Sequence, residues 1–497
     1  MFSCSIIFGQ EKLNSLLNKG REESYKFNLK KAEQIYESAL SFYPQSPEPF
    51  YQLSRLSLWK YLGSRDQGQY KIFRKYAKHS MDRLEPLMDD DDENLELLLL
   101  MAKLNQDEAT ALAYNYEPTE AFWPARRSNS YFKDVLDIDP CNTDALLGSA
   151  IYNYSLSYVP GYLRWILNMT GLETDYVLAL EKLKRAKLCS GDYFPELDFH
   201  LGIVYSEYVA EHDSALILFN RLTSKYPQNI IFRYQASQAR IRSRRLDDAL
   251  IDLERILSVK EVHFQQTKAF CYFHIAEIYF AKNNFQVALD YYKSFIKSTL
   301  DINFNGLSSL RMSICYFALG DEENYKKNLL ETKLGNEELA EDKYAMELAD
   351  GYLVNAFTKD DLIVWKLRNS LVAGEYGLIL EQSKKMSRRK LTNKLRIKVD
   401  AILSEALIQT GDYKRAIPVL SDILRIKEID KKDKMYSKWL LSQAYFEEGE
   451  MELAYQFAAD FDELDYYSDY GLTNGEVFRF TNMLKNYKKQ KNKLKVE

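Results

Sequence analysis

A three-residue pattern recurs along the chain and constrains its fold more than any other feature. In each occurrence an alanine is followed by a residue four positions later and another three positions after that, which places all three on one face of a helix. Neighbouring alanines lie 34 residues (Ala215 to Ala249), 39 residues (Ala249 to Ala288) and 38 residues (Ala416 to Ala454) apart, the spacing of stacked helical hairpins. The pattern therefore predicts an all-α solenoid, an α-α superhelix. The six occurrences are Ala32-Tyr36-Ala39, Ala215-Phe219-Leu222, Ala249-Leu253-Ile256, Ala288-Tyr292-Phe295, Ala416-Leu420-Ile423 and Ala454-Ala458-Phe461.

Length and composition agree with stacked helices. A chain of 497 residues is too long for one globular core, and a repeat array avoids this limit because each hairpin buries its apolar face on its neighbours. Gly 19 and Pro 11 are low counts, and 28% of the residues are charged, which favours long helices with short polar turns. The net charge of −5 excludes a global field that would recruit nucleic acid. We therefore expect no nucleic-acid partner.

The small and aromatic positions resemble those of tetratricopeptide repeats, especially those of bacterial proteins. The resemblance implies a right-handed superhelix that binds proteins and carries no catalytic activity. A narrower stretch, 148–186, carries Ala-Ile-Tyr-Asn-Tyr at 150–154, Val-Pro-Gly-Tyr-Leu-Arg-Trp at 159–165, Gly-Leu at 171–172 and Ala-Leu-Glu-Lys-Leu at 179–183. In this order it is distantly similar to the tetratricopeptide domain 39 family, in which a proline-broken hydrophobic hairpin precedes regular repeats. The first unit carries the pattern at Gly20, Ala32, Tyr36, Ala39 and Pro44, and the best-matched unit at Ala276, Tyr279, Ala288, Tyr292 and Phe295.

The clarity of this pattern varies along the chain and suggests six regions. The glycines in Gly320-Asp321, Gly411-Asp412 and Gly449-Glu450 mark turns between helices. The pattern blurs over 336–392, where we expect a joint between two repeat blocks. The predicted regions are 1–10, a possible truncated signal segment; 11–176, N-terminal repeats with a hydrophobic hairpin; 177–335, regular repeats; 336–392, a degenerate joint; 393–484, C-terminal repeats; and 485–497, a basic tail.

The first ten residues resemble the end of a secretory signal, since they are apolar and stop abruptly at Glu11-Lys12. They favour an exported, periplasmic or envelope-associated bacterial protein; a cytoplasmic protein whose first helix begins here is the alternative. No apolar run reaches the roughly 18 residues that span a bilayer. The segment 158–172 is nevertheless apolar on nearly every side, and it suggests an alternative function as a peripheral membrane adaptor.

The sequence predicts neither an enzyme nor a cofactor or metal site. It lacks the GxSxG, HExxH, GxGxxG and phosphate-loop motifs. Its five cysteines are scattered without a CxxC pair, so we expect no disulfide framework, and Cys271 with His274 lacks a second pair of ligands. The acidic run 89–93 is expected to cap the helix that follows it rather than to bind calcium.

The family resemblance places candidate partner-binding residues on the inward face of the first helix of each hairpin. At the fifth position of this helix, which is one of its inward positions, the aligned residues are aromatic, and Trp439 continues the series. A wall of aromatic side chains suits a protein or peptide ligand in a concave groove. The lysines and asparagines of the family's carboxylate clamp are absent from these places, which argues against a receptor for chaperone tails. The candidates are Phe199, Ile203, Tyr234, Gln238, Phe273, Glu277 and Phe280.

Two alternatives to this groove stay open at the level of sequence. The aromatic residues could pack on the neighbouring hairpin instead of on a partner. The basic run 384–398 could hold an anionic ligand, although a solvated edge of a helical hairpin is the preferred interpretation.

Overall fold

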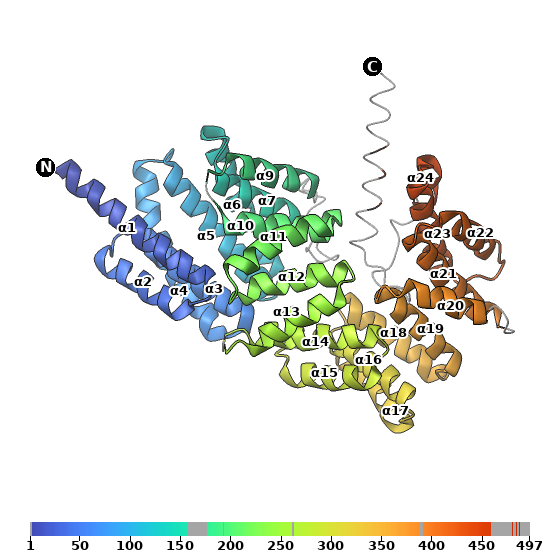
Figure 1. The fold of residues 1–497 in the computed structure, drawn as a ribbon. Coiled ribbons are helices and arrows are strands. Elements are labelled where there is room, and N and C mark those ends of the chain that lie inside the picture. The colour runs from blue at the N-terminus through green and yellow to red at the C-terminus, as the bar shows by residue number, and fades with distance from the viewer. Residues whose placement is uncertain are drawn as a thin grey trace, which may run out of the picture. The chain divides into compact units, whose positions relative to one another are not determined.

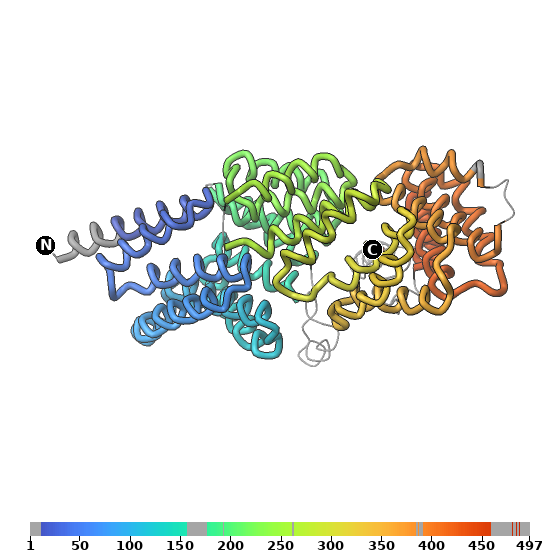
Figure 2. The backbone as a smooth tube through the Cα atoms, turned by 90° about the horizontal axis from the view of Figure 1, so that it is seen from below, coloured from blue at the N-terminus to red at the C-terminus, as the bar shows by residue number. Residues whose placement is uncertain are grey.

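The computed structural model describes residues 2–156, 176–191, 193–260, 263–386 and 391–458, together with positions 480, 484 and 487. Within these residues every regular element is helical and no strand occurs, as the hairpin pattern predicts. The chain divides into two compact units, and the division passes through α13 (Leu246–Ser258) and the start of α14 (Gln265–Ala281). Figures 1 and 2 show successive helices lying side by side within each unit.

Unit 1 comprises residues 1–243 and 251–268. Its helices are α1 (Phe2–Tyr25), α2 (Leu29–Phe42), α3 (Pro47–Ser64), α4 (Gln67–Asp90), α5 (Leu95–Tyr114), α6 (Pro118–Ile138), α7 (Thr143–Ser155), α9 (Tyr176–Cys189), α10 (Pro195–Ile203), the π-helical turn η3 (Val204–Val209), α11 (His212–Lys225) and α12 (Ile230–Arg242).

Unit 2 comprises residues 244–250 and 269–497. Its helices are most of α14, then α15 (Phe285–Ser298), α16 (Asn305–Leu319), α17 (Glu322–Glu331), the 3-10 turn η4 (Thr332–Leu334), α18 (Ala340–Val354), α19 (Lys359–Val372), α20 (Tyr376–Met386), α21 (Asn393–Gln409), α22 (Tyr413–Leu424), α23 (Lys431–Glu447) and α24 (Met451–Ala458).

The recurring alanines lie where two helices of a hairpin approach most closely, and all six are fully buried. Opposite them the first helix also carries small residues. A Cβ added at Gly20 would lie 2.3 Å from the ring of Tyr36, so only glycine allows α1 and α2 to approach this closely. Gly20 precedes Ala32 by twelve residues, and Ala276 precedes Ala288 by the same interval. The sequence pattern thus reports a real packing constraint.

One hairpin contains an extra residue. Gly202 precedes Ala215 by thirteen residues instead of twelve, yet a Cβ at Gly202 would still lie 2.7 Å from the ring of Phe219. The π-helical turn η3 begins two residues after Gly202, and a π-helix accommodates one additional residue per turn. The turn therefore restores the register of the hairpin.

The predicted cap of α5 is partly wrong. The acidic run 89–93 does not supply the N-cap, because α4 continues through Asp90 and the side chain of Asn94 accepts hydrogen bonds from the backbone N–H groups of Glu96 and Leu97 at 3.1 and 3.3 Å. An asparagine oxygen meets the unpaired N–H groups at a helix start as well as a carboxylate does. The acidic residues precede this cap.

The predicted joint at 336–392 holds the regular helices α18, α19 and α20, and the division between the compact units falls elsewhere, near α13. The fully buried carboxylate of Asp342 in α18 accepts hydrogen bonds from the backbone N–H groups of Leu307 and Asn336, both at 2.8 Å. A Cβ at Gly335 would lie 2.6 Å from the backbone nitrogen of Gly306. These contacts depend on individual residues rather than on a repeated pattern, which explains why the region looks degenerate in sequence.

A disulfide joins Cys141 and Cys189, contrary to the expectation from cysteine spacing. Cys141 lies in the turn before α7, and Cys189 is the last residue of α9. The two helices pack antiparallel, so the start of one meets the end of the other (Figure 1). Spacing along the sequence could not reveal this pair, because its two members are brought together by the fold.

Among the described helices, none combines the length and apolar character needed to cross a bilayer.

Candidate partner-binding surface

The predicted residues of unit 1 lie on α10 and α12. Phe199 is partly buried, and its ring packs 5.6 Å from that of Phe232 and 6.5 Å from that of Phe219. Ile203 is 8% exposed and belongs to the hydrophobic core. Tyr234 and Gln238 are both partly exposed. Only the two α12 residues therefore keep side-chain surface outside a packed cluster.

The predicted residues of unit 2 lie on α14 and serve internal packing. Phe273 and Phe280 are 5% and 3% exposed, and both lie in the core of the unit. The carboxylate of Glu277 accepts a hydrogen bond from Tyr292 and pairs with Arg311. Phe273 and Phe280 thus lie as the packing alternative expects, so we do not retain them in the candidate surface.

Trp439, which extends the predicted series, is also buried. It is 4% exposed, and its ring lies 5.1 Å from that of Phe480.

A stripe of partly exposed residues follows one side of α12, and we call it the α12 stripe. It consists of Ile231, Tyr234, Gln238 and Ile241, which are spaced by three or four residues and so share one helix face. The opposite side of α12 is buried in unit 1, where Phe232, Ala236 and Ala239 join the core. The helix is therefore anchored on one side and leaves a mixed apolar and polar face on the other.

A buried group of charged and aromatic residues in unit 1, the Arg55 cluster, was not predicted from the sequence. The guanidinium of Arg55 on α3 lies 2.9 Å from the carboxylate of Glu196 on α10, and its centre lies 5.7 Å from the ring of Trp59. The hydroxyl of Tyr25 on α1 donates a hydrogen bond of 2.7 Å to the same carboxylate. The side chains of Arg55 and Glu196 are only 24% and 14% exposed. Three helices that are distant in sequence therefore meet at one ion pair.

The Arg55 cluster shifts the pKa values of its carboxylate and of a neighbouring histidine. Burial alone would raise the pKa of Glu196, but the charge of Arg55 and the hydrogen bonds from Arg55 and Tyr25 outweigh it and lower the pKa to about 2. Burial lowers the pKa of His200 to about 4, with Glu196 opposing this shift. The Nδ1 atom of His200 lies 2.6 Å from the hydroxyl of Tyr154. At neutral pH the glutamate is therefore charged and the histidine is neutral.

Asp107 on α5 behaves in the opposite way. Its Oδ2 atom is buried and has no hydrogen-bond partner among the described residues. Burial raises the pKa of Asp107 to about 6, although the positive charge of Arg55 opposes the shift.

Unit 2 contains a comparable group, the Arg311 cluster. The Nε atom of Arg311 on α16 lies 3.2 Å from the carboxylate of Glu277, and the guanidinium centre lies 4.9 Å from the rings of Phe280 and Trp365. Because Trp365 belongs to α19, this cluster also joins helices far apart in sequence. In each unit an arginine, partly buried in unit 1 and buried in unit 2, pairs with a glutamate and contacts a tryptophan ring.

Further contacts hold α1 against the turn between α11 and α12 in unit 1. The hydroxyl of Tyr226 donates to Glu22 at 3.2 Å, and the side-chain amide of Asn229 donates to the backbone carbonyl of Tyr25 at 3.0 Å. With the Arg55 cluster, these contacts join α1 and α3 to α10 and to the residues that precede α12.

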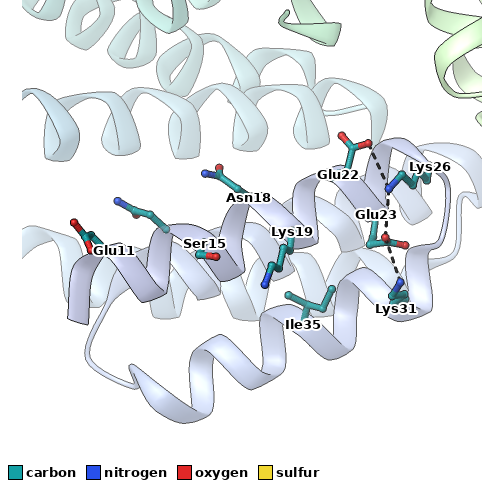
Figure 3. Close-up of a pocket in the computed structure, with 10 residues that line it drawn as sticks. Glu11, Ser15, Asn18, Lys19, Glu22, Glu23, Lys26, Lys31 and Ile35 are labelled. Carbon is teal, nitrogen blue, oxygen red and sulfur yellow. Dashed lines mark ion pairs between the residues drawn. The ribbon is translucent and has the colours of Figure 1, made fainter. Parts of the chain in front are cut away.

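An open groove of about 770 Å³ lies along α1 and α2, and Figure 3 shows that its lining side chains are almost all polar. Glu23 pairs with Lys31 at 3.3 Å and with Lys26 at 3.6 Å (Figure 3). Glu22 also pairs with Lys26, at 3.5 Å. These pairs satisfy charges within the chain, as on a solvated outer face.

Some predicted segments lie outside the described residues. They are 158–172, most of the basic tail 485–497, and positions 387–390 of the basic run. The predictions made for them stay predictions.

The stacked hairpins define a helical-repeat protein of the tetratricopeptide type. More particularly, residues 140–300, about a third of the chain, match the family model described as Iml2/Tetratricopeptide repeat protein 39. The stretch 148–186, whose sequence resembles that family, lies inside the matched range. A search of the curated proteins found no match.

Several solved structures match the chain at low identity and with low TM-scores. A tetratricopeptide repeat protein from Parabacteroides merdae is 14% identical and covers 61% of this chain and 99% of its own, with a TM-score of 0.32. The human IFIT1 dimer with m7Gppp-AAAA is 14% identical and covers 90% of this chain and 93% of its own, with a TM-score of 0.38. Yeast Tom70 is 12% identical and covers 92% of this chain and 100% of its own, with a TM-score of 0.33. None of these likenesses bears on the partner.

Proposed function

We propose that the chain is a non-catalytic scaffold that binds a protein partner through the inner side of its helical array. The α12 stripe is the observation that supports this function. Helical-repeat proteins generally use such surfaces for binding, because stacking leaves one face of each first helix uncovered. Here α12 is held rigidly by its buried face, so its partly exposed side chains are fixed before a partner arrives.

The composition of the stripe indicates what kind of partner fits. Ile231 and Ile241 provide aliphatic surface at its two ends, and between them Tyr234 provides a ring beside Gln238, which is partly exposed although its amide nitrogen is buried. A tyrosine ring offers contact area at a low cost in conformational entropy. An amphipathic helix or extended peptide with apolar side chains suits this surface best.

Substitutions on two sides of the hairpin array test the proposal. Tyr234→Ala and Ile241→Ala remove stripe side chains, whereas Ile217→Ala removes one that is 63% exposed on α11 and serves as the matched control. Proteins captured from the source cell are identified by mass spectrometry for each variant, and Tm is recorded in parallel. We expect the stripe variants to lose about 2 kcal/mol or more of affinity at unchanged Tm, and the control to behave as wild type.

Two outcomes contradict the proposal. If Tm falls and the folded fraction retains its partners, the stripe has a packing role only. If the stripe variants and the Ile217→Ala control retain the same partners at unchanged Tm, binding takes place elsewhere.

An alternative function, peripheral membrane association through 158–172, rests on the sequence alone. Liposome flotation of the full chain separates it from the scaffold, because a scaffold without membrane affinity stays at the bottom of the gradient.

A further inference from the structure

We infer that the bond between Cys141 and Cys189 is a structural disulfide that staples α7 to α9, and that the protein works in an oxidising compartment. The two Cα atoms lie 5.5 Å apart, within the range that a disulfide requires. A separate contact supports the antiparallel pairing of these helices, since the ammonium of Lys182 on α9 donates to Ser149 and Asn153 on α7 at 2.7 and 2.9 Å. The cysteines therefore meet at the end of a hairpin that is also held at its middle.

The four described cysteines differ in their access to solvent. Cys141 is exposed and Cys189 is partly exposed, whereas Cys271 and Cys315 are fully buried. Burial also raises the pKa of the Cys315 thiol well above its usual range, which suppresses the thiolate. Among these four cysteines, thiol–disulfide exchange in the folded protein is thus confined to Cys141 and Cys189.

The bond forms by thiol–disulfide exchange with a donor disulfide, such as oxidised glutathione or a disulfide-donating oxidoreductase. The Cys141 thiolate attacks one sulfur of the donor and releases the other as a thiolate, which gives a mixed disulfide. The Cys189 thiolate then attacks the Cys141 sulfur and displaces the second donor thiolate. Two protons leave the protein thiols, two electrons reduce the donor, and one S–S bond is conserved.

The position of the staple connects it to the packing of unit 1. Cys189 ends α9, and α10 begins at Pro195, immediately before Glu196 of the Arg55 cluster. A fixed end of α9 restricts where α10 starts. Disulfides persist in exported proteins and are rare where thiol reductants dominate, so the bond points to an oxidising compartment.

The first experiment uses the purified full chain, equilibrated with oxidised glutathione, alkylated under native conditions and mapped by mass spectrometry. We expect Cys141 and Cys189 to resist alkylation until dithiothreitol is added, and Cys271 and Cys315 to react on unfolding without reductant. Dithiothreitol should lower Tm by about 5–10 °C in the wild type and leave the Cys141→Ser, Cys189→Ser double variant unchanged.

The second experiment tests the compartment. Source cells are quenched in acid and alkylated before lysis, and the peptides containing Cys141 and Cys189 are recovered as a linked pair if the inference holds. Recovery of both cysteines as alkylated thiols overturns the inference that the protein works in an oxidising compartment. Alkylation of either cysteine in the glutathione-treated protein shows that the disulfide does not form. An equal change of Tm on adding dithiothreitol in the wild type and in the double variant shows that the disulfide does not stabilise the fold.

Discussion

At the scale of single residues, the charged groups of unit 1 matter because they are buried together. A buried ion pair adds little stability compared with an apolar replacement, but removing one partner leaves an uncompensated charge. Glu196 also accepts a hydrogen bond from Tyr25, and the guanidinium of Arg55 lies over the ring of Trp59, so the effect of the pair reaches three helices. The pair therefore specifies how the helices are arranged.

Glu196→Gln should lower the free energy of unfolding by about 2–3 kcal/mol, less than for a fully buried pair because a quarter of the Arg55 side chain is exposed. Urea denaturation followed by circular dichroism measures the loss. The pair Arg425 and Asp422, with side chains 80% and 72% exposed, provides the control, and Asp422→Asn should leave stability unchanged. Equal effects of the two substitutions would show that the Arg55 cluster is solvated.

Three groups of unit 1 with large pKa shifts contribute to the pH dependence of stability. The pKa of His200 is lowered from 6.5 to about 4, so protonation favours the unfolded chain and stability is lost as pH falls from 6.5 towards 4. Glu196, lowered from 4.5 to about 2, adds a loss below about 4.5. Asp107, raised from 3.8 to about 6, acts in the opposite direction, because the folded state gains a proton first. Asp107 thus offsets part of the loss due to His200.

We therefore predict that Asp107→Asn makes the decrease in stability between pH 6 and pH 4 steeper, and that His200→Gln makes it shallower. Urea denaturation at a series of pH values measures both slopes. If Asp107→Asn flattened the profile, the direction assigned to its pKa would be wrong.

At the scale of elements, the small residues set the distance between paired helices. Gly20→Ala should destabilise the protein by about 1–3 kcal/mol, because the new methyl group would overlap the buried ring of Tyr36. Gly351 in α18 is the matched control, since a Cβ there meets no atom within 4 Å. Gly351→Ala should stabilise by about 0.5–1 kcal/mol through helix propensity. Thermal denaturation of both variants decides the sign at each site.

The turns between helices place either a glycine or a non-glycine residue in a backbone conformation with positive φ. Gly320, Gly411 and Gly449 have positive φ, as their sequence positions predict. Arg244 and Ala210 also have positive φ, at 60° and 58°. The Arg244 side chain donates to the backbone carbonyl of Leu371 at 3.0 Å and contacts Tyr376. These contacts with a part of unit 2 that is distant in sequence offset the cost of the strained backbone at Arg244.

Glycine substitution should separate these roles. Arg244→Gly relieves strain but loses the contacts with α19 and α20, so we expect a net loss of about 1–2 kcal/mol. Ala210→Gly relieves strain at an exposed turn and should stabilise by about 0.5 kcal/mol. Chemical denaturation measures both, and stabilisation of both variants would mean that the Arg244 contacts contribute nothing.

The sequence predicts the elements well and their long-range contacts poorly. Ala32 and Ala288 mark hairpins because helix pairing repeats at a nearly fixed interval, and this interval is visible in the sequence. Arg55 and Glu196 lie far apart in sequence and belong to no repeated pattern, so nothing local links them. The predicted inward positions Phe273 and Phe280 are real first-helix positions, but their burial depends on contacts such as that of Phe280 with Trp365 on α19.

At the scale of the whole molecule, the two compact units should unfold in separate steps, because each has its own core and its own buried arginine cluster. Hydrogen exchange in increasing urea should show α3 and α10 opening at a different concentration from α16 and α19. Glu196→Gln should shift the step of unit 1 alone, and Glu277→Gln that of unit 2 alone. A single transition shifted equally by both substitutions would contradict the division.

The contacts between helices that are far apart in the sequence of unit 1 limit how this protein can evolve. An open array gains or loses a hairpin by duplication or deletion, since each repeat touches only its neighbours. In unit 1, α1 is bonded to the residues that precede α12, through Tyr25 and Asn229, and α3 to α10 through Arg55 and Glu196. Insertion of another hairpin between these points would separate both pairs at once. The copy number of repeats in this part of the chain is therefore fixed by geometry.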